Sequence, residues 1–137
     1  CFTGGFALAA AVDDSVLASV LSQPSVPIAL TSAHKRDPGF SEGEMKVIEK
    51  RAAENNLCAL GLRFSGDPMA PGERFKTLKD RLGDNFEVIE IDSSPGNSGG
   101  FGRMAHSVLT LEVRETDGQP AYEARKRVME FLKERLT

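Results

Sequence analysis

The feature that most constrains the fold is a regular alternation of short apolar runs with amphipathic segments. Three runs have the length and flanking turns of buried strands, and they cover residues 16–21, 57–64 and 86–91. Apolar residues at helical spacing predict helices over residues 41–56, 71–82 and 120–136. Because strands separated by helices form parallel sheets, we expect an α/β fold with a mostly parallel sheet and flanking helices.

Local signals refine these boundaries. Ser41 and Glu44 form a capping box, and Gly83 is a typical residue for the end of a helix. Residues 4–13 are apolar almost all round, which predicts a short buried helix. The last helix is expected to turn an apolar stripe inward, formed by Ala121, Ala124, Val128, Phe131 or Leu132, and Leu136.

Other segments give weaker signals. Residues 26–30 contain Pro27, which cannot donate a ladder hydrogen bond, so we expect an edge strand or an extended loop. Residues 34–40 are polar and rich in Pro and Gly, which predicts a loop. Residues 107–113 are apolar with a β tendency.

Composition limits the function. With 137 residues the chain has the size of one domain, and a net charge of −3 offers no general attraction to nucleic acid or anionic lipid. The apolar run at residues 6–12 is too short to span a membrane. Two cysteines make no disulfide framework and suit a reducing compartment, so we expect a cytoplasmic protein. The glycine-rich loop at 96–102 lacks the ending of a phosphate loop, and no zinc pattern occurs, so no cofactor or metal is expected.

Three reactive side chains fall where this topology would bring them together. Asp67 follows the strand at 57–64, and His106 lies in the loop after the next strand. Cys1 precedes the first helix, beside a glycine-rich turn, where the helix N-terminus favours thiolate over thiol. Because parallel strands end at one edge of the sheet, these residues are expected to converge there.

Each candidate has a competitor or a structural alternative. Asp is also a common turn residue and His a common packing residue, and Asp92 is a second acid at a strand end. His34 lies in a charged loop that suits a solvated side chain, and Cys58 falls within an apolar strand as an inert thiol. Arg63 and Arg103 flank the acid and the histidine, where they would bind an anionic substrate group or simply carry surface charge.

The order of nucleophile, acid and histidine resembles that of the α/β-hydrolases. The stretch Cys1-Phe2-Thr3-Gly4-Gly5-Phe6 is similar to the nucleophile elbow of the dienelactone hydrolase family, in which cysteine replaces serine. Residues 60–68 resemble the strand of that fold that ends in Gly-x-Asp, and residues 94–107 resemble its histidine loop.

This resemblance implies a function. Cys1 would be the nucleophile, His106 the general base, Asp67 the group that orients the imidazole, and the backbone N–H of Phe2 an oxyanion donor. The substrate would be a small ester or lactone, cleaved through a thioester intermediate without a cofactor.

The chain departs from the family pattern in two ways. Thr3 stands where the elbow has glycine, and the strands that precede the elbow are missing. We therefore expect residues 1–137 to form the C-terminal half of a single hydrolase domain, with impaired activity and with self-association or pairing with the missing half. Two alternatives are a non-catalytic interaction fragment of hydrolase ancestry and an N-terminal-nucleophile amidohydrolase, which would be dominated by antiparallel strands.

Overall fold

The computed structural model describes residues 1–137 and contains one three-stranded sheet in the order β1-β2-β3. The strands are β1 (Ala18–Ser22), β2 (Cys58–Phe64) and β3 (Phe86–Ile91). Both pairings are parallel, with Ala18 opposite Cys58 and Ala59 opposite Phe86. The predicted α/β fold with a parallel sheet is confirmed, and the third strand lies at the margin of the sheet as expected.

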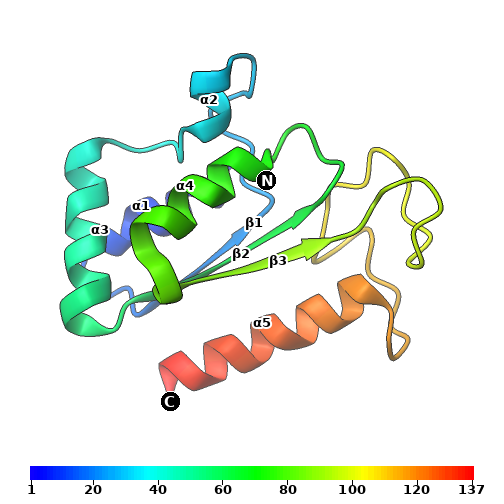
Figure 1. Ribbon diagram of the computed structural model, residues 1–137. Helices are drawn as coiled ribbons and strands as arrows, with labels where there is room; N and C mark the ends of the chain where they lie inside the picture. The colour runs from blue at the N-terminus through cyan, green and yellow to red at the C-terminus, as the bar shows by residue number, and fades with distance from the viewer.

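Helices cover both faces of the sheet (Figure 1). One face carries α1 (Gly4–Ala9) with its 3-10 extension η1 (Ala10–Val12), α3 (Glu42–Asn55) and α4 (Gly72–Leu82). A second 3-10 turn, η2 (Gly83–Asn85), leads from α4 into β3, and α5 (Pro120–Leu136) covers the opposite face. The short helix α2 (Ser32–Arg36) projects from the end of the molecule at the top of Figure 1.

Side-chain alternation along β2 divides the core into two layers. Leu60, Leu62 and Phe64 pack toward α5, whereas Ala59 packs toward α3 and α4. Gly61 faces the same layer as Ala59, where an added Cβ would lie 2.7 Å from Cζ of Phe86 and 2.8 Å from Cε1 of Phe75. The central strand is therefore buried on both faces, as is typical of parallel sheets.

The expected helix signals are present in the structure. Ser41 and Glu44 make both hydrogen bonds of the capping box at the start of α3, which ends where Asn56 adopts a left-handed conformation. Gly83 follows α4 with a φ of 56°, a value that glycine adopts without strain. Capping therefore sets the ends of the two helices that connect the strands.

Three expectations need correction. Residues 34–36 belong to α2, because the Thr31 hydroxyl accepts a hydrogen bond from the His34 backbone and starts a helical turn. Residues 107–113 form turns and no strand, because their hydrogen bonds join near neighbours: the N–H groups of Thr110 and Glu112 both donate to the Ser107 carbonyl. Leu136, expected to face inward, is exposed at the last residue of α5. Residues 26–30 are an extended loop, one of the two predicted forms.

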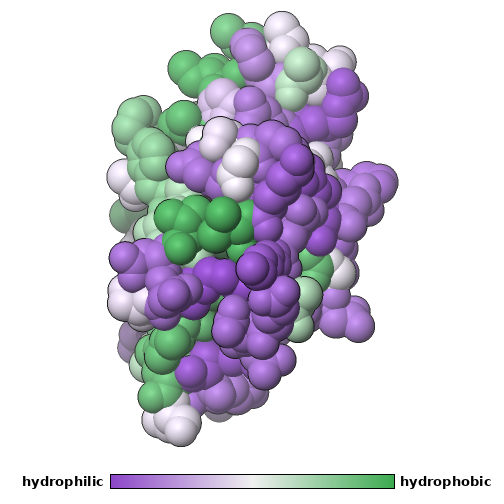
Figure 2. Space-filling model, turned by 90° about the vertical axis from the view of Figure 1, so that its left-hand side faces the viewer, coloured by the Kyte–Doolittle hydropathy of each residue, from purple (hydrophilic) through white to green (hydrophobic).

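No helix of the protein combines the length and the apolar composition needed to cross a bilayer. Figure 2 nevertheless shows hydrophobic surface gathered along one margin of the face that it draws, opposite a mostly hydrophilic margin. Several large apolar side chains remain exposed to solvent, among them Phe6, Leu17 and Leu111.

Candidate active site

Cys1, His106 and Asp67 meet at the carboxyl edge of the sheet. The Nε2 atom of His106 lies 2.8 Å from Sγ of Cys1, and its Nδ1 atom lies 2.5 Å from Oδ2 of Asp67. The three side chains therefore form one continuous hydrogen-bonded chain. They come from segments that are far apart in the sequence, so the fold of the sheet and its loops creates the arrangement.

Backbone hydrogen bonds hold Cys1 at the end of β1. The Cys1 nitrogen donates to the carbonyl oxygen of Ser22 at 2.9 Å, and the Cys1 carbonyl accepts from the Ser25 N–H at 3.2 Å. The following helix lies close to the same loop, because a Cβ added at Gly4 would lie 2.9 Å from Cα of Pro24. The small residue after Thr3 thus permits the close approach that brings the thiol to the sheet edge.

The carboxylate of Asp67 is almost completely buried, and both of its oxygens have partners. Its residue is 2% exposed; Oδ1 accepts a hydrogen bond from the Met69 N–H at 2.9 Å, while Oδ2 faces the histidine. The turn before it is joined to the end of β3, because the Gly66 N–H donates to Oγ of Ser93 at 3.0 Å. This double anchoring fixes the direction of the carboxylate toward His106.

The loop that carries His106 is fixed on both sides of the histidine. Before it, the Phe101 ring packs on Phe64 with 4.8 Å between centroids, and the Asn97 side chain bonds both the N–H and the carbonyl of Phe101. After it, the Val108 N–H donates to Oε1 of Gln23 at 3.4 Å. A loop without regular secondary structure is thereby tied to β1 and β2.

The contacts favour one tautomer of the neutral imidazole, with its hydrogen on Nδ1. An ionised Asp67 can only accept, so Nδ1 carries the hydrogen of that contact. Nε2 is then free to accept the proton of the Cys1 thiol, and in the resulting imidazolium it donates to the thiolate. This is the arrangement required of a nucleophile, a base and an orienting group.

The backbone N–H of Phe2 donates no hydrogen bond within the protein. It belongs to the residue directly after the nucleophile, where an N–H can face the oxygen of a substrate carbonyl attacked by sulfur. The structure contains no group of three or more His, Cys, Asp or Glu side chains that could hold a metal ion.

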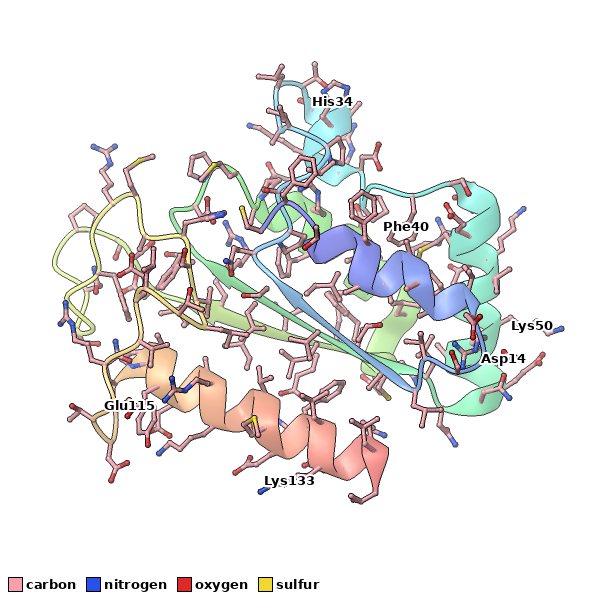
Figure 3. The ribbon with its side chains drawn as sticks, turned by 180° about the vertical axis from the view of Figure 1, so that it is seen from behind. Asp14, His34, Phe40, Lys50, Glu115 and Lys133 are labelled. Carbon is pink, nitrogen blue, oxygen red and sulfur yellow. The ribbon has the colours of Figure 1, made fainter.

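The competing residues lie elsewhere. Asp92 is exposed and accepts a hydrogen bond from the Ser94 N–H at 2.9 Å, and hydrogen bonds from Ser94 hold its pKa below the usual range. His34 lies on the projecting helix α2 (Figure 3). Cys58 is buried in β2, as expected. Only Asp67 contacts the histidine of the site, so the structure favours it over Asp92.

The two arginines suggested for anion binding differ in burial. Arg63 is buried, and its guanidinium donates to the carbonyls of Ala70 and Ser65 and pairs with Glu90. These contacts disfavour the expected substrate role of Arg63, because its hydrogen-bonding groups are engaged within the protein. Arg103, in contrast, is exposed on the histidine loop.

Sequence reasoning missed two residues that support the site. Arg74 is fully buried, and its guanidinium donates to the carbonyls of Pro24, Pro27, His34 and Asp37, at 2.5 to 3.0 Å. It therefore holds the loop that packs beside Cys1. Gln23 is buried beside the site and connects the end of β1 to the histidine loop. Arg74 lies four residues before Leu78 on the inner stripe of α4, a spacing that could have revealed it.

Comparisons with models of known protein families, with curated proteins and with solved structures gave no match.

Proposed function

We propose that the protein is a cysteine hydrolase that cleaves small esters or lactones through a thioester intermediate. The observation that carries this proposal is the hydrogen-bonded chain from Sγ of Cys1 through the imidazole of His106 to the carboxylate of Asp67. A merely structural histidine does not require a thiol on one nitrogen and a buried carboxylate on the other. Together these contacts supply a nucleophile, its base and the group that orients the base.

In the first half-reaction, His106 Nε2 accepts the thiol proton and Sγ of Cys1 attacks the carbonyl carbon. The carbonyl electrons move to oxygen, and the free N–H of Phe2 stabilises the oxyanion. The tetrahedral intermediate then collapses, the bond to the alcohol oxygen breaks, and His106 returns its proton to that oxygen. The acyl group remains on sulfur as a thioester.

In the second half-reaction, His106 takes a proton from water, and the hydroxide attacks the thioester carbonyl. Collapse releases the carboxylic acid, and the proton on His106 returns to the sulfur. The Asp67 carboxylate accepts the Nδ1 hydrogen in both halves and stabilises the imidazolium form of His106. Bonds and protons balance without a metal or an organic cofactor.

The order of nucleophile, acid and histidine along a parallel α/β chain supports a relationship to the α/β-hydrolases. Among them, the cysteine of the Cys-Phe-Thr-Gly-Gly segment favours the dienelactone hydrolase family. The alternative of an N-terminal-nucleophile amidohydrolase is disfavoured, because it calls for antiparallel strands and both strand pairs here are parallel.

Steady-state hydrolysis of p-nitrophenyl acetate tests the proposal. The chain offers a matched control for two of the proposed residues, since it contains one other cysteine and one other histidine. Cys1→Ala and His106→Ala should each lower turnover at least about 10³-fold. Cys58→Ala and His34→Ala remove the other thiol and the other imidazole, and they should retain turnover within about threefold, as expected for residues outside the site.

Turnover must be distinguished from a single reaction of an exposed thiol with an activated ester. The expected result is many product molecules per protein molecule, with a linear steady state after any burst. Hydrolysis that stops after one equivalent, or that proceeds equally in Cys1→Ala and Cys58→Ala, would overturn the proposed function.

A further inference from the structure

An apolar groove of about 380 Å³ opens beside Cys1. Two of its wall residues, Ser25 and Pro68, border the proposed catalytic residues directly. The other six are hydrophobic, and they are Phe2, Val26, Ile28, Ala29, Leu30 and Met69. A volume of this size falls within the range of small-molecule sites.

The groove is continuous with the reacting atoms. Phe2 directly follows Cys1, and Oγ of Ser25 lies 3.4 Å from Sγ of Cys1. At the other end, Pro68 directly follows Asp67 in the chain. A molecule bound covalently to Sγ therefore has the groove as its immediate surroundings.

The groove walls are exposed and uncharged. Phe2, Ile28 and Leu30 are 67%, 70% and 80% exposed, so most of their apolar surface is available for burial. No charged residue lines the groove. An anionic group would lose its hydration there without gaining a partner, whereas an alkyl chain would bury apolar surface.

The position of the histidine indicates which part of an ester the groove receives. The alcohol takes its proton from His106 as it leaves, so it departs on the side of the imidazole. Neither His106 nor its loop contributes to the groove, whose walls include both neighbours of Cys1, Phe2 and Ser25. The groove therefore lies on the side of the acyl group, which stays attached to sulfur through both half-reactions.

We infer that this groove binds the uncharged alkyl chain of the acyl group, so that the preferred substrates are esters of medium-length aliphatic acids. The inference rests on the proposed function and specifies its substrate class. Phe2, Ile28 and Leu30 set the preference for chain length by covering successive carbons of the chain.

A series of p-nitrophenyl esters from acetate through butyrate and hexanoate to octanoate tests this inference. Complete burial of one methylene group is worth about fourfold in affinity, so in this open groove kcat/KM should rise about twofold per methylene. A charged analogue of matched length, the p-nitrophenyl monoester of succinic acid, should be hydrolysed more slowly than the butyrate ester.

Substitutions in the groove localise the effect. Ile28→Asp and Leu30→Asp place a carboxylate on exposed positions and should lower the octanoate-to-acetate ratio of kcat/KM at least about fivefold. Leu111→Asp changes an equally exposed leucine outside the groove and should leave the ratio unchanged. Circular dichroism spectra of all three variants should match that of the unsubstituted chain.

The outcomes separate the two proposals. Turnover that depends on Cys1 but shows equal kcat/KM for all chain lengths would overturn the groove inference and leave the proposed hydrolase function standing. The same holds if Ile28→Asp and Leu30→Asp leave the octanoate-to-acetate ratio of kcat/KM unchanged. A preference for the succinate ester does the same. No Cys1-dependent turnover of any ester overturns the proposed function, and the groove inference falls with it.

Discussion

The Nδ1 atom of His106 lies 2.5 Å from Oδ2 of Asp67, although 39 positions separate the two residues in the sequence. Both lie beyond the carboxyl ends of neighbouring strands, and a pair of hydroxyl contacts joins the two loops. The Ser93 N–H donates to Oγ of Ser65 at 3.0 Å, and the Gly66 N–H donates to Oγ of Ser93 at 3.0 Å. The acid and the histidine are therefore held together by the loops as well as by their own contact.

Asp67→Asn is the first prediction. The amide can donate a hydrogen to Nδ1, which favours the wrong tautomer and leaves Nε2 unable to accept the thiol proton. Ester turnover should fall by about 10²- to 10⁴-fold with little change in KM. Asp92→Asn is the matched control at the neighbouring strand end and should keep its rate within about threefold. Equal losses in the two variants would contradict the assigned role of Asp67.

Arg74→Met is predicted to destabilise the fold. The methionine fills much of the buried space but leaves the carbonyls of Pro24, Pro27, His34 and Asp37 without their donor. Only the Pro24 contact is fully buried, and an unsatisfied buried carbonyl costs about 1–3 kcal/mol, whereas water can partly replace the donor at the other three. Urea unfolding should therefore show a loss of at least about 2 kcal/mol.

Arg103→Met provides the control for that measurement, because Arg103 is exposed. Its free energy of unfolding should stay within about 0.5 kcal/mol of that of the unsubstituted chain. A small effect at Arg74 would mean that the loop of residues 24–37 does not depend on the buried guanidinium.

The sequence was informative where a local pattern has one physical reading. The capping box of Ser41 and Glu44, the glycine at the end of α4 and the apolar run of β2 each specify local structure from neighbouring residues alone. The convergence of Cys1, Asp67 and His106 also followed from the sequence, because parallel strands place their following loops on one edge.

Other features depend on contacts that the sequence does not display. The sequence alone suggests that Arg63 and Arg74 are surface cations. In the folded protein Arg63 pairs with Glu90 of β3, and Arg74 is buried against the loop of residues 24–37. Residues 107–113 have the composition of a strand, but only Val108 finds a buried position, and hydrogen bonds between near neighbours make the segment a series of turns. Tertiary packing overrides the local tendency at these positions.

Gly61→Ala is predicted to destabilise the sheet. The new methyl group would lie 2.7 Å from Phe86 Cζ and 2.8 Å from Phe75 Cε1, so both rings must move. Overpacking of this kind costs about 1–3 kcal/mol. At Gly102 an added Cβ meets nothing within 4 Å, so Gly102→Ala should leave the free energy of unfolding nearly unchanged. Chemical denaturation of both variants provides the test, and equal stability of the two would argue against close packing at Gly61.

Acid should weaken the start of α3. Hydrogen bonds from Ser41 hold the pKa of Glu44 below its usual value of 4.5. Because the folded state lowers this pKa, the contribution of Glu44 is fully present above pH 4.5 and is lost as the pH falls through the lower folded value. Unfolding free energies of Glu44→Gln and the unsubstituted chain should therefore differ at neutral pH and converge in acid.

Ser41→Ala provides the control for that measurement, because it removes the hydroxyl that bonds the carboxylate. In the Ser41→Ala background, the change in unfolding free energy caused by Glu44→Gln should depend less on pH. A difference that persists unchanged to about pH 3 would contradict the capping explanation.

The central claim is that Sγ of Cys1, activated by His106, forms a covalent acyl intermediate. Acid quenching during turnover of p-nitrophenyl acetate, followed by peptide mapping by mass spectrometry, measures this directly. We predict one acetyl group on Cys1, none on Cys58, and acylation that slows at least about 10²-fold in His106→Ala. Turnover without acyl-Cys1, or acylation of Cys1 as fast in His106→Ala as in the unsubstituted chain, would contradict the claim.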